Sequence, residues 1–409
     1  MACILKVPNE KSCGVIIITT PERDRQVNRI PELRKAIECL KNKWLIGLHH
    51  NWHDLKFRYD PLYDFSMAGD SDLKESSNIL FPLLQMDACN FVPDIFKPSK
   101  GEKFWDILYV ARAVYFKRIP EFFEIIRKLY SAGHKIRVLF ICPVPPFDEL
   151  QVKTVFYDIR EVYDNLFSED EKNLFTLLTI DYRYPFPFDL DTLAFYYRSS
   201  KVFVHSADDE RRCRVAAYAW ASGLPVIGME CVGSLLNASE RRNPYFYEAK
   251  CYEDFSNQIL TALASIQKND WDQSLISQSF SESSTPDILD EKLKKIAYKK
   301  GYDYELGNMA RSNLSLRLGR HHEGLKNPNS FKITLTDFIS FISDHQYNLS
   351  ELISKIDPEN EIDSFMVSSW FPAGSMKASS MNNGLARFAN RLRPLNLLRK
   401  IYRLKTKLL

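Results

Sequence analysis

Glycine is scarce in this chain of 409 residues, which holds only 14, and no G-x-G-x-x-G or P-loop pattern occurs. Phosphate-binding loops of the dinucleotide-binding and NTPase kinds therefore have no local support. The eight cysteines are scattered and form no C-x-x-C pair. This spacing argues against a zinc site or a disulfide framework and favours free thiols in a reducing compartment.

Long apolar runs are missing as well. No stretch of about 18 apolar residues occurs, so a membrane-spanning helix is not expected. The first residues lack the apolar core of a signal peptide, so we expect a cytoplasmic protein. The 27 Phe and 20 Tyr argue against general disorder, and the length favours two domains.

Acidic residues are absent beyond Asp363, whereas nine Lys and Arg residues follow it. Because the whole chain carries a net charge of +3, the residues up to Asp363 carry about −6. In residues 385–409, apolar residues recur at helical spacing among basic ones, which is typical of a helix on an anionic membrane surface. The same helix equally fits docking on the protein's own acidic body. An acidic body with no DNA or RNA module argues against nucleic acid as a partner.

Strand and helix patterns alternate through the middle of the chain. Amphipathic stretches separate apolar runs that are typical of buried strands, and these runs lie at 13–20, 44–52, 104–112, 135–144, 174–185, 201–206 and 224–231. Such alternation predicts an α/β fold with parallel sheets covered on both faces. In these folds ligands bind beyond the carboxyl ends of the strands.

Composition divides the chain into four parts. We expect an abbreviated α/β domain at 1–96 and a complete one at 97–270, joined by a linker rich in Pro and Lys. A C-terminal helical extension follows at 271–380, with a helix near Pro286, and then the basic amphipathic tail at 381–409.

A charged turn follows the strand that ends at Ser206. Glu210, Arg211 and Arg212 lie in this turn, ahead of an Ala-rich helix that stops near Gly223. A helix N-terminus offers unpaired N–H groups and the positive end of a dipole, so together with these arginines it suits a phosphate. Glu210 suits the hydroxyl groups of a sugar. A solvated loop with acidic helix-capping residues accounts for the same charges.

This turn resembles part of the donor-binding domain of retaining, family-4-type glycosyltransferases, which have the GT-B fold. In that family a Ser and a Glu follow the strand, a second Glu lies on the helix, and the sequence A-x-G-x-P-V-I comes next. Here Ser206, Glu210 and the segment "ASGLPVIG" from Ala221 match. Eight residues after Glu210, where the family has its second Glu, this chain has Tyr218.

Two further motifs match in the same order along the chain. Arg112 and Lys117 have the spacing of the family's G-R-x-x-x-x-K-G motif, whose Arg and Lys bind the donor diphosphate, although Ala111 and Arg118 replace the glycines. The segment "NFVPDIFKP" at 90–98 is similar to the family's interdomain linker. Taken alone, Arg112 and Lys117 also fit an ordinary surface pair.

The resemblance implies a GT-B-like fold of two Rossmann-like domains, with the first abbreviated. It implies transfer of a sugar, expected to be a hexose, from a nucleotide-sugar to a glycan, lipid-linked or other acceptor, with retention and without a metal or other cofactor. Lys117 and Arg112 would stabilise the leaving diphosphate, and Glu210 would hold the donor sugar. The other expected substrate-binding residues are Ser206, Arg211, Arg212 and Tyr218.

Three histidines follow the second predicted strand. Because the acceptor domain of that family often places a histidine near the reacting sugar, we assign His49 and His53 as catalytic candidates, with His50 between them. Ordinary core or surface histidines fit as well, and no partner ligands at zinc spacing accompany them. The pair Asp189 and Asp191 mimics a D-x-D metal motif but fits the acidic first turn of a helix.

The replacement of the second Glu by Tyr218 leaves a second function open. A tyrosine does not accept two hydrogen bonds from a ribose as a carboxylate does. The alternative to an enzyme is therefore a catalytically silent GT-B-like binding or scaffold protein, peripheral to the membrane.

Overall fold

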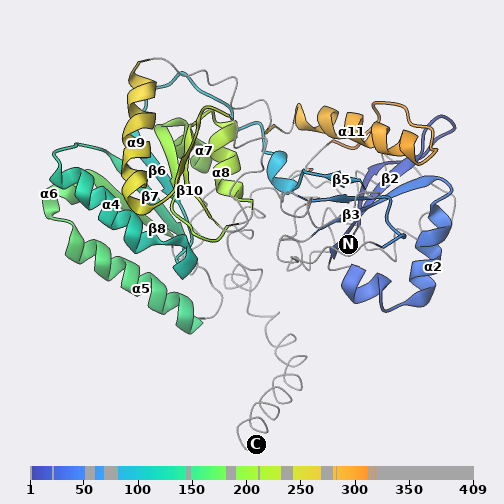
Figure 1. Cartoon of the computed structure of the whole chain (residues 1–409), viewed down its shortest axis with the longest axis horizontal. Helices are drawn as coiled ribbons and strands as arrows, with labels where there is room; N and C mark the ends of the chain where they lie inside the picture. The colour runs from blue at the N-terminus through green and yellow to red at the C-terminus, as the bar shows by residue number, and fades with distance from the viewer. Residues whose placement is uncertain are drawn as a thin grey trace, which may run out of the picture.

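A computed structural model of the chain has two α/β domains, seen as two lobes in Figure 1. The structure describes residues 2–20, 23–50, 60–68, 82–143, 149–180, 190–210, 212–231, 243–268, 280–281, 283–311, 314 and 318. His53, Arg211, Asp189 and the tail at 381–409 lie outside the described residues.

The first domain holds a five-stranded sheet in the order β1-β2-β3-β4-β5. Strand β1 runs antiparallel to β2, and the other neighbours are parallel. The strands are β1 (Ala2–Lys6), β2 (Gly14–Thr19), β3 (Trp44–His49), β4 (Phe65–Met67) and β5 (Leu83–Leu84). The helical elements of this part of the chain are η1 (Arg23–Val27), α2 (Pro31–Leu40) and η2 (Ala88–Asn90).

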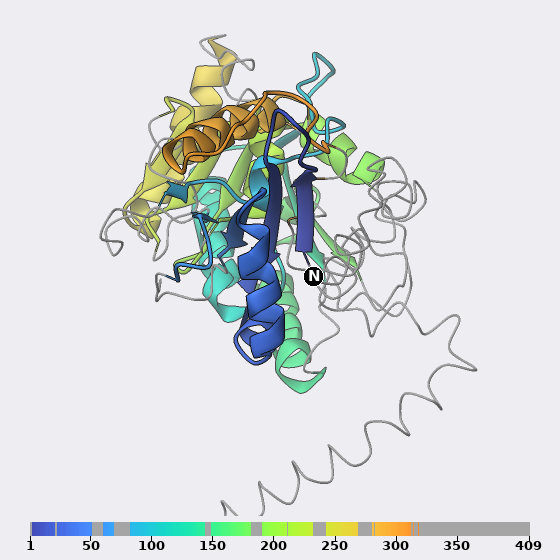
Figure 2. The ribbon, with the colours of Figure 1, turned by 90° about the vertical axis from the view of Figure 1, so that its right-hand side faces the viewer.

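Two helices from distant parts of the sequence cover this first sheet. The apolar side of α2 packs on one face through Ile37, against the side chains of β2 and β3 that point that way. The other face is covered by α11 (Thr285–Lys299), whose Leu289 and Leu293 lie in one cluster with Val15 and Phe65. Figures 1 and 2 show α11, in orange, beside the strands of this sheet.

A buried polar cluster fixes the chain after α11 to strand β1. The Lys6 ammonium donates to the carbonyl oxygens of Glu305 and, at 3.0 Å, of Gly307, and lies 4.2 Å from the centre of the Tyr304 ring. The Asp290 carboxylate accepts from the Tyr304 hydroxyl and from the Gly307 N–H. Because a buried ammonium and a buried carboxylate are costly without partners, this network favours one docking of the returning segment.

The second domain holds a six-stranded parallel sheet in the order β11-β10-β9-β6-β7-β8. Its strands are β6 (Trp105–Val110), β7 (Val138–Pro143), β8 (Phe175–Ile180), β9 (Ser200–His205), β10 (Val226–Met229) and β11 (Phe246–Ala249). Its helical elements are η3 (Tyr115–Lys117), α4 (Ile119–Ser131), α5 (Glu149–Leu166), α6 (Glu169–Lys172), α7 (Leu190–Arg198), α8 (Arg214–Ala221) and α9 (Tyr252–Gln267). Counted along the chain, this is the strand order of the doubly wound Rossmann fold.

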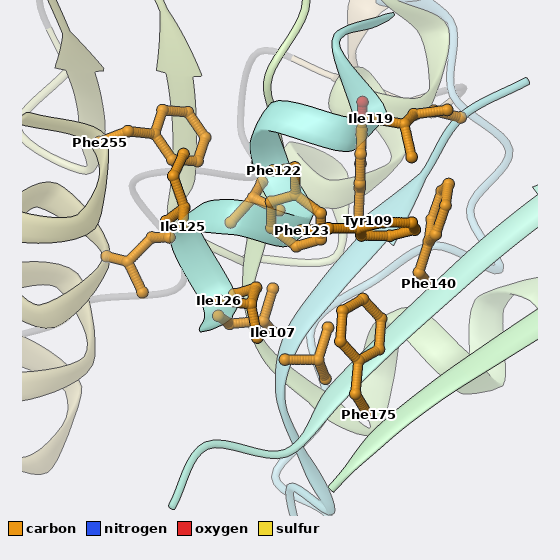
Figure 3. Close-up of a cluster of buried hydrophobic side chains, with 14 of the residues drawn as sticks. Ile107, Tyr109, Ile119, Phe122, Phe123, Ile125, Ile126, Phe140, Phe175 and Phe255 are labelled. Atoms are coloured by element: carbon orange, nitrogen blue, oxygen red, sulfur yellow. The ribbon is translucent and has the colours of Figure 1, made fainter. Parts of the chain in front are cut away.

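Both faces of the second sheet carry apolar cores. On one face the aromatic rings of α4 pack against Tyr109, Phe140 and Phe175 (Figure 3), and α5 and α9 complete this layer. On the other face α7 and α8 pack together with the linker residue Phe96. Because both faces are buried, the strands read as continuous apolar runs, which is the pattern of a parallel sheet.

The segment between the domains makes contacts on both sides. Arg198 at the end of α7 donates to the Ile95 carbonyl at 2.8 Å, which ties the linker to the second domain. Thr285 at the start of α11 donates to the Asn90 carbonyl at 3.1 Å. The chain therefore crosses between the domains twice in one region, once before β6 and once before α11.

The predicted α/β class with two Rossmann-like domains is confirmed by one parallel sheet and one sheet that is parallel except for β1. Strand β1 was not predicted, because its short sequence "ACILK" has no turn signal ahead of it. The first described part of the expected extension at 271–380 packs on the first sheet through α11. No helix in the described part of the chain has the length and apolar character needed to cross a bilayer.

Candidate active site

The candidate site lies where the second sheet reverses its winding. From β6 the chain adds β7 and β8 on one side, and it then returns to add β9, β10 and β11 on the other. Strands β6 and β9 are parallel neighbours, with Tyr109 opposite Val204 in register. The loops that leave their carboxyl ends diverge to opposite faces, and this divergence opens a ligand crevice in doubly wound folds.

Lys117 and Glu210 come from these two loops and meet. Lys117 ends the short helix η3 after β6, and its ammonium forms an ion pair with Glu210 Oε2 in the loop after β9. The side chains are only 10% and 12% exposed, respectively. An ion pair held this far from water is much less screened than a surface pair.

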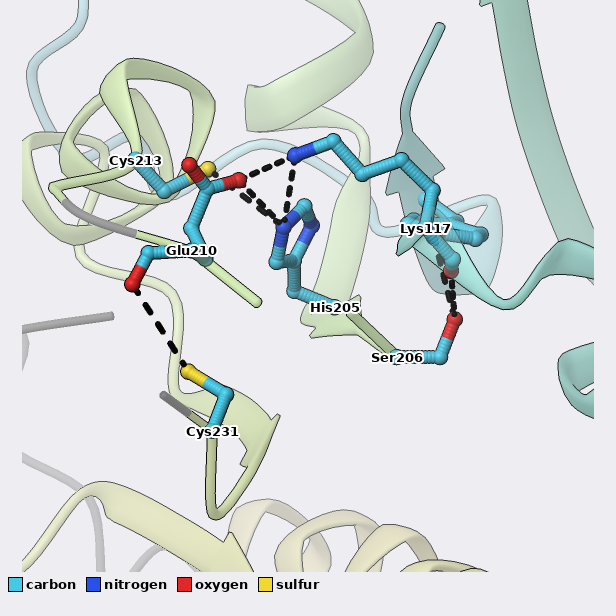
Figure 4. A network of polar contacts seen from close by, with 7 residues as sticks. Lys117, His205, Ser206, Glu210, Cys213 and Cys231 are labelled. Carbon is cyan, nitrogen blue, oxygen red and sulfur yellow. Dashed lines mark hydrogen bonds and ion pairs between the residues drawn. The ribbon is translucent and has the colours of Figure 1, made fainter. Parts of the chain in front are cut away.

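His205 completes this contact from the last residue of β9. Its Nε2 lies 3.2 Å from the Lys117 ammonium and 3.0 Å from Glu210 Oε2, and its side chain is 1% exposed. Figure 4 shows the three groups converging, with Cys213 Sγ 3.7 Å from the same Nε2. Cys213 is the residue just before α8.

Burial and the neighbouring charges set the protonation states of these groups. Burial, helped by the Lys117 ammonium, lowers the pKa of His205 to about 4 against the pull of Glu210. Burial alone would raise the pKa of Glu210, but Lys117 and His205 outweigh it and hold that pKa well below its usual range. At neutral pH the cluster therefore contains an ionised carboxylate and a neutral imidazole.

A neutral imidazole limits how the cluster is hydrogen-bonded. With one proton on the ring, Nε2 either accepts from the Lys117 ammonium or donates to the Glu210 carboxylate. The two bonds exclude each other. If Lys117 moves to another anion, His205 remains able to donate to Glu210 and hold it in place.

Ser206, the residue after β9, connects the two loops through buried hydrogen bonds. Its buried hydroxyl lies 2.8 Å from the Lys117 carbonyl oxygen and 3.0 Å from the Tyr109 hydroxyl. The Tyr109 hydroxyl itself donates to the Lys117 carbonyl at 2.8 Å. At the surface, Arg118 and Asp208 form an ion pair between the same loops. Ser206 thus fixes the backbone that carries Lys117, and its expected role in binding substrate stays a prediction.

Arg118 has a left-handed backbone, with φ of +50°. It occupies the position at which the resembled family has a glycine, and it directly precedes α4. A residue with a side chain pays a steric penalty in this conformation that glycine does not. The turn before α4 thus has a backbone conformation that favours glycine, although Arg118 occupies it.

Arg112 and Arg212 lie in different surroundings. Arg112 follows β6 and has an exposed side chain at the same sheet edge as Glu210. Arg212 has a buried side chain that donates to the Asn90 side chain at 2.8 Å and lies 3.5 Å from Asp87. Arg212 therefore contacts the segment between the domains, and its expected role in binding the donor stays a prediction.

Tyr218 is a core residue of α8. Its side chain is buried, and its ring stacks on Phe96 of the linker with centroids 4.2 Å apart and 13° between the planes. Tyr197 contacts it edge-on. The residue that replaces the family's second Glu therefore packs against the linker, and contact with a nucleoside stays a prediction.

The predicted histidines belong to the first domain. His49 ends β3 and His50 follows it, so both lie at the carboxyl edge of that sheet, and both are buried. The Thr20 hydroxyl donates to the His49 carbonyl at 3.0 Å. The catalytic roles of His49 and His53 stay predictions.

His205 and Cys213 were not expected from the sequence as site residues. His205 lies in the apolar run "KVFVH", in which all residues from Val202 on are buried, so strand periodicity does not show which face it occupies. The available signal was its position as the last residue of a strand that meets the charged turn, since such ends carry functional residues in parallel sheets.

Comparison with solved structures gives likenesses of low sequence identity. TarM has a TM-score of 0.47 and 13% identity, with 69% of this chain and 54% of TarM covered. The pneumococcal O-GlcNAc transferase GtfA, in complex with UDP and GlcNAc, has a TM-score of 0.41 and 11% identity, covering 65% of this chain and 55% of its own. A glycosyltransferase from Rickettsia africae ESF-5 has a TM-score of 0.47 and 12% identity, with 68% and 89% covered.

This chain thus spans only about half the length of TarM and of GtfA. No family model matches the chain, and no curated protein does. Because the three TM-scores lie below 0.5, we base the functional interpretation on the residues of the site.

Proposed function

We propose that the protein is a glycosyltransferase that binds the diphosphate of a nucleotide-sugar at the junction of β6 and β9. The observation that carries this proposal is the buried contact of Lys117 with Glu210 at the reversal point of a Rossmann sheet. This is where doubly wound folds bind nucleotides. The two residues also match the spacing of the motifs that the sequence shares with retaining GT-B enzymes.

In this proposal the ion pair opens when the donor binds. The Lys117 ammonium leaves Glu210 for the diphosphate and stabilises the charge that develops on the leaving group, and the exposed Arg112 supplies a second cation. Glu210 then accepts hydrogen bonds from the donor sugar, while His205 donates to Glu210 and keeps it oriented. No protein nucleophile is assigned.

The finer features follow the resemblance. We propose transfer of a hexose with retention of configuration and without a metal cofactor, because the charge of the leaving group is met by side-chain cations. The protein holds the ribose of the donor in another way than the resembled family does, because Tyr218 replaces the second carboxylate and is stacked on Phe96.

Turnover of UDP-, GDP- and ADP-sugars by the purified protein tests the proposal. We expect slow hydrolysis of at least one donor in the absence of acceptor. Lys117→Ala and Arg112→Ala should each lower this turnover by about 10- to 1000-fold, because each removes charge from the leaving-group site.

A matched control is available on the same two strands. Lys201 of β9 forms an ion pair with Asp106 of β6 at 2.7 Å, at the amino ends of these strands. Lys201→Ala should leave turnover unchanged. Binding of a nucleotide-sugar without any turnover would support the silent scaffold protein instead. Wild-type turnover in a Lys117→Ala, Arg112→Ala double variant would show that the donor does not bind at the junction of β6 and β9.

The acceptor is proposed from the basic tail. If residues 385–409 bind an anionic membrane surface, a lipid-linked or membrane-bound glycan acceptor follows and the protein is peripheral to the membrane. Co-sedimentation with anionic vesicles should pellet the full chain and not a chain that ends at Asn383. Equal behaviour of the two would contradict the membrane proposal.

A further inference from the structure

The proposed function leaves one feature of the site unused, namely its thiol. Cys213 is buried, with 5% of its surface exposed, and its Sγ lies 3.7 Å from His205 Nε2. The mutual distances among this sulfur, His205 Nε2 and a Glu210 carboxylate oxygen are all within 4.8 Å. Imidazole, carboxylate and thiol donors thus face one point beside the Lys117 ammonium (Figure 4).

We infer that His205, Glu210 and Cys213 form a binding site for a zinc-type divalent ion, which competes with the Lys117 ammonium for their donor atoms. The combination of imidazole nitrogen, carboxylate oxygen and thiolate sulfur is typical of zinc sites. Soft sulfur and nitrogen donors disfavour Mg²⁺ and Ca²⁺, which take oxygen ligands.

The distances suit this ion. Two ligands that bind zinc at about 2.0–2.3 Å in a tetrahedral arrangement lie about 3.3–3.6 Å apart. The observed separations are 3.0 Å from His205 Nε2 to Glu210 Oε2 and 3.7 Å from the same nitrogen to Cys213 Sγ. Small side-chain movements are therefore enough to close the site around an ion, with the fourth position open.

The backbone holds two of these ligands firmly. His205 is the last residue of the central strand β9, and Cys213 directly precedes α8. Glu210 lies in the short loop between them, so all three ligands come from nine consecutive positions. Site formation thus needs no movement of one domain relative to the other.

The Lys117 ammonium occupies part of the position that the divalent ion would take. It contacts Glu210 and His205, two of the three donors. A divalent ion carries two positive charges where the ammonium carries one. It would also bind the Cys213 sulfur, with release of the thiol proton. The two cations repel each other at this distance, so binding of the ion requires the lysine side chain to withdraw.

Metal binding to the full chain tests the inference without any measurement of transferase activity. Zn²⁺ affinity is measured by competition with a chromogenic chelator, and Co²⁺ serves as an optical probe of the same ligands. We expect one ion per chain, with a thiolate-to-cobalt charge-transfer band. Cys213→Ser should abolish the band and weaken Zn²⁺ binding at least about 10-fold, while the exposed Cys251→Ser should change neither.

The role of the lysine gives a second, opposite expectation. Lys117→Met keeps the length of the side chain and removes its charge, so it should tighten Zn²⁺ binding at least about 10-fold. Lys201→Met is the matched control and should have no effect. The inference is overturned by a natural chain that binds no Zn²⁺, by a 1:1 cobalt complex without the thiolate band, or by unchanged affinity in Lys117→Met. The cobalt spectrum of the wild-type protein shows whether a thiolate binds the ion, even if Cys213→Ser does not fold.

Discussion

The Lys117 ammonium lies 3.2 Å from His205 Nε2, and both groups belong to loops or strand ends of neighbouring strands in a sheet that is buried on both faces. The same imidazole nitrogen also faces Glu210 at 3.0 Å. The imidazole of His205 thus lies between the charges of Lys117 and Glu210. Because this ring can take up a proton, we expect the stability of the second domain to depend on pH.

Acid should destabilise the protein through His205. Burial first, and Lys117 next, lower the folded-state pKa of His205 to about 4, whereas an unfolded histidine titrates near about 6.5. Between these values the unfolded state binds a proton that the folded state does not, so stability falls as the pH falls through this window. From pH 7 to pH 5 the loss should be about 2 kcal/mol.

Urea unfolding of the wild type and of His205→Gln at pH 7 and pH 5 measures this effect. The two proteins differ only at this residue, so the difference between the two pH dependences isolates His205. Parallel pH dependences in the two proteins would show that His205 is not held neutral by its surroundings.

Glu210→Gln should impair sugar transfer more than Tyr218→Phe. The amide keeps the shape of Glu210 but loses the charge and one acceptor, and an unmatched buried polar group costs about 1–3 kcal/mol. Tyr218 packs against Phe96 in the core. Steady-state turnover of the preferred nucleotide-sugar checks the order, and unchanged turnover in Glu210→Gln would exclude Glu210 from the donor site.

Removal of the Tyr218 ring should destabilise the protein. The stack with Phe96 joins α8 to the linker, and truncation of a large buried aromatic residue typically costs about 3–5 kcal/mol. We expect this loss for Tyr218→Ala, whereas Tyr218→Phe, which keeps the stack, should stay within about 1.5 kcal/mol of the wild type. Denaturant unfolding gives both values. A small effect of Tyr218→Ala would mean that this side chain is less tightly packed than the structure shows.

Arg118→Gly and Arg118→Ala should affect stability differently. Both variants lose the exposed ion pair with Asp208, which is worth about 0–1 kcal/mol. Only glycine adopts the φ of +50° without steric strain. For a residue with a side chain this left-handed conformation costs about 1–2 kcal/mol. The glycine variant should therefore be the more stable of the two by about 1 kcal/mol. Equal thermal unfolding temperatures would argue against backbone strain at this turn.

Leu293→Ala should destabilise the first domain by about 2–5 kcal/mol, because it opens a cavity in the core between α11 and the sheet. Tyr298 lies on the same helix and is 85% exposed, so Tyr298→Ala should change the stability by less than about 0.5 kcal/mol. Thermal unfolding of the two variants compares them directly. Equal effects would indicate that α11 is not part of this core.

Much of the second domain follows from sequence because its strands are buried on both faces. The runs that contain Val110, Cys142 and Val204 have no polar alternation, and turns with charged or glycine residues mark their ends. The strand order brings Lys117 and Glu210 to one edge of the sheet, and their roles in binding the donor stay predictions.

Other features depend on contacts that no local pattern encodes. Arg212 pairs with Asn90, which is 122 positions away, and the linker ring of Phe96 fills the space beside Tyr218. Neither partner can be identified from spacing, because only the folded chain brings these residues together. The sequence did not identify His205 as a site residue for a related reason. In a strand that is buried on both faces, the residues on the two faces have similar apolar neighbours in the sequence, so no pattern distinguishes them.

The return of α11 to the first sheet makes the first domain discontinuous in the sequence, with the Rossmann domain inserted between its two parts. About 200 residues separate β5 from α11, so at roughly 5–20 residues per second the ribosome needs about 10–40 s to supply the missing helix. During this time the face of the sheet that carries Val15 and Phe65 lacks the cover that α11 provides in the folded protein. The inserted domain has all its strands available earlier and is expected to fold first. We therefore expect the order of folding in the cell to be the reverse of the order in which the domains begin along the chain, and we expect a chaperone to protect the first sheet of the nascent protein.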